Sequence, residues 1–152
     1  MAILDLIRER KWAPRALGGL TMGADPIVTA VSVLSTQMLA SSGHQEPIHG
    51  FLVRKAEKAH GTGRRIEGFR EKGAPVVIVD DVCTTGGSTL QAIAAARDFG
   101  FEIVGVLCLV EREEAGGRSA VEDTAQGAPF VALFTANQVR EAHLRLRSAR
   151  TH

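Results

Sequence analysis

The sequence predicts an α/β fold in which a mostly parallel central sheet is flanked by helices. Along most of the 152 residues, segments with strand character alternate with segments of helical periodicity, as expected for a covered parallel sheet. Residues 76–79 form an apolar, β-branched run, which is typical of a central strand buried on both faces. Polar and glycine-rich loops follow several of the expected strands. Such loops lie at the carboxyl edge of the sheet, where open α/β sheets bind ligands.

The bulk composition favours one ordinary domain over residues 1–152 that binds a small molecule. The chain is 45% hydrophobic and 23% charged, with a formal net charge of +1. A chain of this length can bury a core without metal or disulfide staples. The near-zero charge does not favour a nucleic-acid or membrane-surface partner, so we expect neither.

The cysteines and the first residues favour a reducing, cytoplasmic location. Cys83 and Cys108 have no metal-ligand spacing, so we expect no disulfide framework. The first ten residues are amphipathic and charged, unlike a signal peptide. No segment approaches transmembrane length.

In the first half of the chain, an amphipathic helix at residues 2–10 leads into a short strand at 16–20. The next turn ends in Asp25 and Pro26, which suit the cap and the first position of a helix reaching about residue 40. A polar loop then precedes a short strand at residues 51–53.

Residues 54–72 are rich in Lys, Arg and Glu and have no sustained apolar period. We therefore expect a mobile loop or a hairpin here rather than part of the core.

The second half begins with the central strand and continues the alternation of helices and strands. Gly100 suits the end of a helix that starts near Ser88. Residues 111–118 form a further loop at the same edge of the sheet. The remaining elements are expected at residues 103–110 (strand), 119–126 (helix), 129–134 (strand) and 137–147 (helix).

The stretch from residue 76 to residue 89 carries the clearest chemical signal. Asp80 and Asp81 leave the strand, and a loop of hydroxyls and glycines then leads into a helix whose free N–H groups suit a phosphate. The stretch lacks the patterns of a nucleoside triphosphate loop and of a dinucleotide fold. Two carboxylates beside a phosphate need something between them, and a ribose fits: its hydroxyls donate to the carboxylates while its 5-phosphate reaches the loop. The alternative is an ordinary β–α turn with solvated aspartates.

Residues 76–89 resemble the phosphoribosyl pyrophosphate (PRPP) motif of type I phosphoribosyltransferases. Residues 54–63, followed by Ile66, Glu67 and Gly68, resemble the catalytic loop of orotate phosphoribosyltransferases in the spacing of Arg, Lys, His and Gly. Glu111 and Arg112 match the same family. The resemblance extends from about residue 18 to residue 137.

The resemblance implies the type I phosphoribosyltransferase fold with a long flexible catalytic loop, and transfer of the phosphoribosyl group from PRPP to orotate. It implies Mg²⁺ as cofactor, held by Asp80 and Asp81 directly or through water. It also implies a homodimer in which the loop at residues 54–68 reaches the partner's site.

The resemblance further implies roles for individual residues. Catalysis would fall to Lys58, His60, Asp80 and Asp81. PRPP would be bound by Arg54, Lys55, Lys58, His60, Asp80, Asp81, Val82, Cys83, Thr84, Thr85, Gly86, Gly87 and Ser88. The pyrophosphate loop would consist of Thr21, Met22, Gly23, Ala24 and Asp25, and orotate would contact Thr84 and Arg112. Three alternatives stay open: a basic loop that is merely solvated, an ordinary capped turn at residues 21–25, and a surface ion pair for Arg112.

The sequence also departs from the family. Only residues 1–15 precede the first core strand, so we expect the N-terminal section that forms a hood over the base to be absent. The turn at Met22 and Gly23 lacks a lysine that some members have. Two other functions are therefore weighed: a phosphoribosyltransferase acting on another base, and a module that binds PRPP or a nucleotide with little or no turnover.

Overall fold

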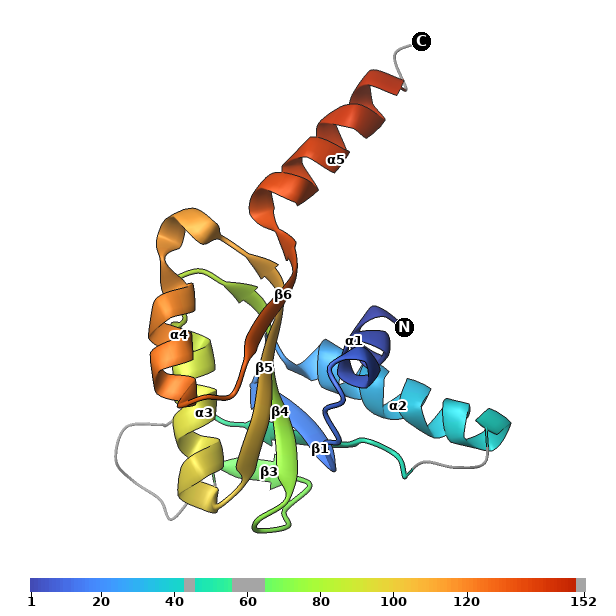
Figure 1. Cartoon of the computed structure of the whole chain (residues 1–152), viewed down its shortest axis with the longest axis vertical. Coiled ribbons are helices and arrows are strands. Elements are labelled where there is room, and N and C mark those ends of the chain that lie inside the picture. The colour runs from blue at the N-terminus through green and yellow to red at the C-terminus, as the bar shows by residue number, and fades with distance from the viewer. Residues whose placement is uncertain (43–45, 56–64, 150–152) are drawn as a thin grey trace.

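The structure, a computed structural model, describes residues 1–42, 46–55 and 65–149 (Figure 1). The strands of the described part form a 6-stranded sheet with the order β3-β2-β1-β4-β5-β6. Neighbouring strands are parallel throughout, except that β3 runs antiparallel to β2. The strands are β1 (Ala16–Leu20), β2 (His49–Val53), β3 (Ile66–Gly68), β4 (Pro75–Cys83), β5 (Glu102–Glu111) and β6 (Phe130–Thr135).

Helices cover both faces of the sheet, and one helix projects away from it (Figure 1). The apolar side chains of β4 alternate between the faces, as the two-residue period of a strand requires. Val76 and Ile78 pack in the core beneath α3, whereas Val77 and Val79 pack beneath α1 and α2. The helices are α1 (Ala2–Glu9), α2 (Asp25–Ser42), α3 (Gly87–Phe99), α4 (Gly117–Ala125) and α5 (Ala136–Ala149), with a 3-10 turn, η1, at Glu113–Ala115.

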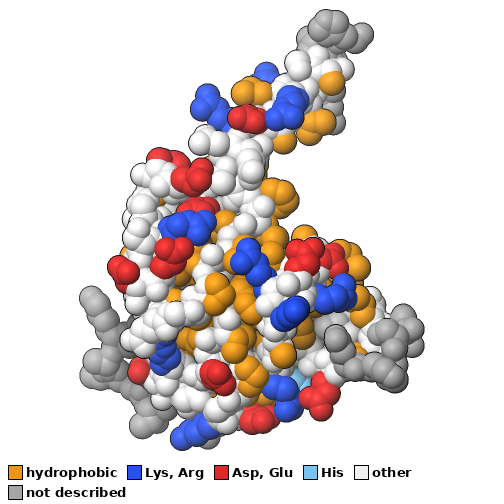
Figure 2. All heavy atoms as spheres, in the orientation of Figure 1, with side chains coloured by type: hydrophobic (Ala, Val, Ile, Leu, Met, Phe, Trp, Pro, Cys, Tyr) orange, Lys and Arg blue, Asp and Glu red, His pale blue; other side chains and the backbone are white. Residues whose placement is uncertain are grey.

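The projecting helix, α5, has no buried residue. Figure 2 shows hydrophobic side chains exposed along this arm between charged ones. They include Val139, Leu144 and Leu146. None of the helices in the described ranges is long and apolar enough to span a membrane.

The predicted fold class is confirmed, and the predicted strand at residues 16–20 matches β1. For the segment at residues 54–72, the hairpin interpretation is right where the structure describes it, because Ile66–Gly68 pairs with β2. The strand predicted at residues 51–53 begins earlier, at His49, whose ring stacks on that of Phe69. Both cysteines are free and buried.

Two local predictions were wrong. We expected Asp25 to cap α2, but it is the first residue of that helix, and its Oδ1 is buried without a hydrogen-bond partner. We expected Glu111 in a loop, but it is the last residue of β5 and only 3% exposed. The strand continues through this charged residue because an arginine neutralises it, as described below.

Candidate active site

The two aspartates lie within β4, which runs on to Cys83 instead of ending before them. Asp80 is 5% exposed and lies on the face covered by α3, where its Oδ2 accepts a 2.8 Å hydrogen bond from Thr89 Oγ1. Asp81 is exposed, and its Oδ1 accepts a 2.8 Å hydrogen bond from the backbone N–H of Val82. The pair is therefore divided between an inner and an outer carboxylate.

Burial changes the acid strength of the inner carboxylate. Loss of hydration raises the pKa of Asp80 above its ordinary value, and the charge of Asp81 adds to the rise. The hydrogen bond from Thr89 opposes this shift by stabilising the carboxylate. Asp80 thus depends on α3 to hold its charge.

The loop between β4 and α3 is open at the start of the helix. Gly86 adopts φ 80° as the N-cap of α3, and no side chain of the described residues hydrogen-bonds to that helix end. A Cβ at Gly87 would meet only Thr85 Oγ1, at 3.9 Å. Thr85, Gly87 and Ser88 are exposed. Free N–H groups at the positive end of a helix dipole, with space in front of them, suit an anion.

The loop after β1 touches the acidic pair. A Cβ at Gly23 would lie 2.7 Å from Asp81 Oδ1 and 3.2 Å from Asp80 Oδ1. Met22 beside it has φ 83° and is 79% exposed, a conformation that costs a bulky residue free energy. Ala24, also predicted for this loop, is buried. The small residue and the strained backbone bring this loop directly against the carboxylates.

An apolar groove opens beside these groups. Its volume is about 420 Å³, and its lining includes Met22, Gly23, Asp81, Leu109 and Leu133. The remaining lining comes from residues of α1 and α2. The outer carboxylate therefore lies at the border between the polar loops and an apolar surface.

The loop after β5 holds Arg112 close to the end of β4. The backbone N–H of Arg112 donates a 2.9 Å hydrogen bond to the carbonyl oxygen of Cys83. Its side chain is exposed and donates from Nε to Glu114 Oε1 at 3.0 Å. The ion-pair alternative for Arg112 is thus present in this conformation, at the residue for which the family resemblance implies a contact with orotate.

The cationic segment is only partly within the described residues. Arg54 and Lys55 are exposed at the end of β2, and Arg54 Nη1 donates to Glu67 Oε1 at 3.0 Å. Lys58 and His60 lie outside the described residues. Of the predicted PRPP residues on β4, Val82 is partly exposed, whereas the Cys83 side chain is in the core, so only its backbone faces the neighbouring loop.

The donor set suits a magnesium ion that also binds substrate phosphates. Among the described residues there is no group of three or more His, Cys, Asp and Glu side chains that could form a metal cage. Mg²⁺ is commonly bound through one or two carboxylates, with water and phosphate oxygens completing the octahedron. The exposed carboxylate of Asp81 beside an anion-binding loop fits this pattern, with Asp80 behind it.

Four residues of the site region were not singled out from the sequence: Thr89, Glu111 as a buried group, Gly117 and Arg118. Thr89 follows Asp80 at the start of a helix, and its role depends on how that helix returns across the strand. The other three bring α4 against the loops of β4 and β5. No spacing in the sequence indicates this contact.

Residues 24–125 match the family described as the phosphoribosyl transferase domain. The adenine phosphoribosyltransferase of Saccharomyces cerevisiae has a similar fold, with a TM-score of 0.61 at 21% identity over 87% of this chain and 73% of that one. The family match at residues 24–125, together with the sheet order and the acidic pair at the carboxyl edge of the sheet, defines the chain as a phosphoribosyltransferase of the type I fold.

More similar relatives narrow the class. The orotate phosphoribosyltransferase of Aquifex aeolicus is 41% identical over 138 residues, which are 91% of this chain and 69% of the relative. That of Streptomyces avermitilis is 44% identical over 128 residues, 84% of this chain and 65% of the relative. The Mycobacterium tuberculosis orotate phosphoribosyltransferase in complex with PRPP superposes with a TM-score of 0.69 at 34% identity, covering 89% of this chain and 69% of that one.

The chain belongs to the orotate phosphoribosyltransferase family. It spans about two thirds of the length of these relatives.

Proposed function

We propose that this chain transfers the phosphoribosyl group of PRPP to orotate, giving orotidine monophosphate and pyrophosphate. The proposal rests above all on one observation: the acidic pair of β4, the uncapped start of α3 and the loop after β1 meet at one edge of the sheet. The family relationship supports the same conclusion. Residues 1–152 would act as one phosphoribosyltransferase domain.

The 5-phosphate of PRPP would bind at the start of α3. The N–H groups there have no side-chain cap, and the hydroxyls of Thr85 and Ser88 are exposed beside them. The backbone of Thr84, in the same loop, lies against Gly117, which follows the loop that carries Arg112. Negative charge at this helix end is favoured by the dipole, so the phosphate would fix one end of the substrate.

The ribose hydroxyls would donate to the acidic pair, chiefly to the exposed carboxylate of Asp81. Asp80 would contribute less to this contact, because its Oδ2 already accepts a hydrogen bond from Thr89. Asp81, with Asp80 behind it, would hold a magnesium ion, and such an ion would supply positive charge that compensates the leaving group. The loop at residues 21–25 lies directly beside Asp81, and its backbone would face the same pyrophosphate.

Departure of pyrophosphate leaves an oxocarbenium-like ribose, so this chemistry needs compensated charge and excluded water more than a strong nucleophile. Arg54, Lys55, Lys58 and His60 would supply positive charge to the leaving group. In a dimer, the segment at residues 54–68 would carry these groups to the partner's site. Asp80 and Asp81 would stabilise the positive charge that develops on the ribose.

Orotate would be held through its carboxylate by Arg112, since a guanidinium can bind a carboxylate with two parallel hydrogen bonds. Arg112 would first exchange its contact with Glu114 for the substrate. That exposed ion pair is weak enough to be replaced, because such pairs contribute about 0–1 kcal/mol.

One observation favours the two other functions weighed from the sequence. These are a module that binds PRPP or a nucleotide with little turnover, and a phosphoribosyltransferase that acts on another base. The apolar groove beside Asp81 is open in this structure. A base would be poorly enclosed on that side.

The deciding experiment measures loss of orotate absorbance with PRPP and Mg²⁺. The wild-type chain should consume orotate, and Lys58→Ala should slow this strongly while leaving PRPP binding measurable by calorimetry. If the wild-type chain binds PRPP but consumes neither orotate nor another base, the binding module is the right function.

A second pair of variants tests the acidic pair. Asp81→Asn should weaken PRPP binding in the presence of Mg²⁺ by about tenfold or more. Asp98→Asn, an exposed carboxylate on α3 near its C-terminal end, is the matched control and should leave binding unchanged. Equal affinities for wild type and Asp81→Asn would remove the acidic pair from the site.

A further inference from the structure

We propose that the ion pair between Glu111 and Arg118 positions two loops relative to each other. These are the loop between β4 and α3, residues 84–86 (the phosphate loop), and the loop after β5, residues 112–116 (the Arg112 loop). Glu111 ends β5, and Arg118 lies in the first turn of α4. The proposal rests on the function proposed above, in which the phosphate loop binds the 5-phosphate of PRPP and the Arg112 loop binds orotate.

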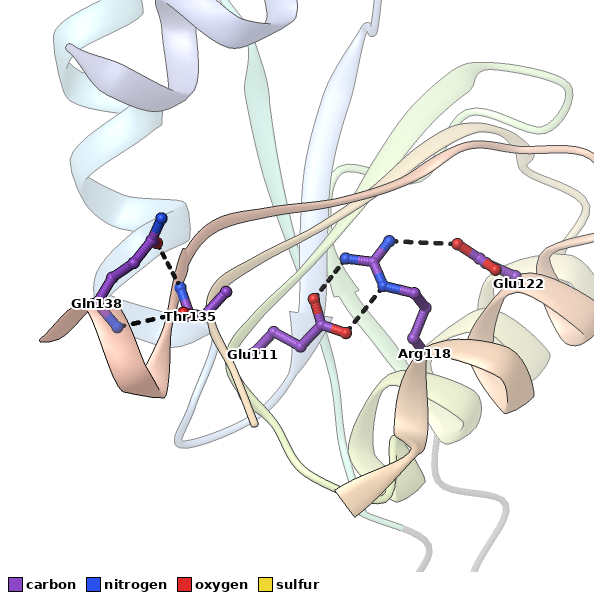
Figure 3. A network of polar contacts seen from close by, with 5 residues as sticks. All are labelled: Glu111, Arg118, Glu122, Thr135 and Gln138. Atoms are coloured by element: carbon purple, nitrogen blue, oxygen red, sulfur yellow. Dashed lines mark hydrogen bonds and ion pairs between the residues drawn. The ribbon is translucent and has the colours of Figure 1, made fainter. Parts of the chain in front are cut away.

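The pair is buried on one side and has the geometry of a clamp. Glu111 is 3% exposed, and Arg118 Nε donates to its Oε1 at 2.9 Å. The Nη2 group of Arg118 donates to Oε2 of the same carboxylate, so the two groups meet with two parallel hydrogen bonds (Figure 3). A bidentate contact fixes orientation as well as distance.

Other contacts prevent the guanidinium from swinging. Its central carbon lies 4.8 Å above the ring of Phe130 on β6. Its Nη1 donates to Glu122 Oε1 at 3.3 Å, one turn further along α4 (Figure 3). Arg118 thus ties the start of α4 to the last residue of β5 and to the first residue of β6.

The residue before it transmits this constraint to the phosphate loop. Gly117 lies so close to that loop that a Cβ there would clash with the carbonyl oxygen of Thr84 and lie 2.8 Å from the backbone nitrogen of Gly86. Backbone packs directly on backbone, without an adaptable side chain between them. A shift of α4 would therefore move or release the loop expected to hold the 5-phosphate.

The residue after Glu111 transmits the constraint to the other loop. Arg112 follows Glu111 directly, and its backbone N–H donates to Cys83, the residue paired with Glu111 in the sheet. The loop from Arg112 to Gly116 is consequently closed at its base by the ion pair. The same pair thus sets both the position of Arg112 and the contact of Gly117 with the phosphate loop.

Burying the carboxylate of Glu111 is a costly way to gain stability, because desolvation offsets much of its attraction to Arg118, whose side chain is 43% exposed. The role of this ion pair is therefore better explained by the orientation that its two parallel hydrogen bonds impose on α4 than by a gain in folding free energy. An apolar pair of similar volume would hold α4 against the sheet, but it would not fix the angle of the helix start.

The test compares Arg118→Met with Arg97→Met. Arg97 on α3 also anchors α4, but at its other end, by donating from Nη2 to the carbonyl oxygen of Ala125 at 2.7 Å. Both variants should lower the melting temperature. Only Arg118→Met should weaken ribose 5-phosphate binding, measured by calorimetry, and raise the KM for orotate, each by about tenfold and with a smaller change in kcat.

Arg118→Lys supplies the conservative variant. It keeps the charge but not the two parallel hydrogen bonds, so we expect losses of about threefold, between wild type and Arg118→Met. If Arg118→Met does not fold, this variant carries the test, and wild-type affinity in it would overturn the proposal. Equal losses in Arg97→Met and Arg118→Met would also overturn it, since they would indicate general loosening of α4.

The two levels of inference can fail separately. If the wild type does not turn over orotate but Arg118→Met still binds ribose 5-phosphate more weakly than Arg97→Met, the proposed function is wrong and the positioning role stands. If orotate is consumed normally by Arg118→Met, the positioning role is wrong and the function stands.

Discussion

The hydrogen bond between Thr89 and Asp80 allows a quantitative prediction. Thr89→Val keeps the shape of the side chain but removes the hydroxyl that donates to Asp80 Oδ2 at 2.8 Å. Thr89 is 1% exposed and Asp80 is 5% exposed, so water cannot readily replace the lost donor. A hydrogen bond to a charged group contributes about 1.5–3 kcal/mol, and without it Asp80 keeps the 3.1 Å hydrogen bond that its Oδ1 accepts from the backbone N–H of Asp81. Near pH 8 we therefore expect Thr89→Val to lower the free energy of unfolding by about 2 kcal/mol.

The same variant should cost less in acid. The pKa of Asp80 is raised above 3.8 in the folded protein, so the folded state holds this proton more tightly than the unfolded chain. The resulting contribution to stability is complete below pH 3.8 and is lost as the pH rises through the folded-state pKa. Without the Thr89 donor that pKa rises further, so below pH 3.8 the carboxyl group is protonated in both proteins and only a bond between neutral groups is lost, about 1 kcal/mol.

Urea unfolding of wild type and Thr89→Val at both pH values measures the difference. Thr36→Val is the matched control: its hydroxyl donates to the carbonyl oxygen of Ser32 on the exposed side of α2, so its effect should be small and independent of pH. A destabilisation by Thr89→Val that is the same at both pH values would refute the reasoning, because Asp80 would then not depend on Thr89 for its charge.

Three further variants test the loops around the acidic pair. Gly117→Ala should destabilise the fold by about 1–3 kcal/mol in chemical denaturation, because its methyl group would overlap the Thr84 backbone; an unchanged midpoint would mean that α4 moves freely against the loop. Met22→Gly should raise the free energy of unfolding by about 0.5–1 kcal/mol by relieving the positive φ, and a loss of stability would show that the Met22 side chain is needed. Glu114→Gln should lower the KM for orotate about twofold to fivefold, because Arg112 no longer has a competing carboxylate; a higher KM would show that Glu114 helps to orient Arg112.

The sequence predicted those features that depend on local pattern. The apolar run at residues 76–79 specified a strand buried on both faces, and β4 is a central strand as expected, with β1 and β5 on either side. Gly100 ends α3 with φ 101°, as predicted from its place after an apolar helix. Because parallel strands carry their following loops to one edge, the meeting of Gly23 with the acidic pair could also be anticipated.

The features that escaped prediction depend on which elements meet in space. A glutamate at a strand end is usually solvated, so nothing in the sequence marks Glu111 as buried. Its burial follows from the neutralising contact with Arg118, which belongs to a helix beginning several residues later. The different environments of Asp80 and Asp81 arise in the same way, because only the inner carboxylate meets α3.

The α5 helix is stabilised differently from the elements that pack in the core, because none of its side chains is buried. A helix of 14 residues without a buried side chain is marginal in water when left to its own propensity. Its start is instead secured by a reciprocal pair, in which Gln138 N–H donates to Thr135 Oγ1 at 3.2 Å and Thr135 N–H donates to Gln138 Oε1 at 2.9 Å (Figure 3). Hydrogen exchange in α5 should therefore proceed by fraying from its C-terminal end, independently of global unfolding. We therefore expect the last helix to unfold separately from the sheet, with its first turn held at the end of β6 by this pair.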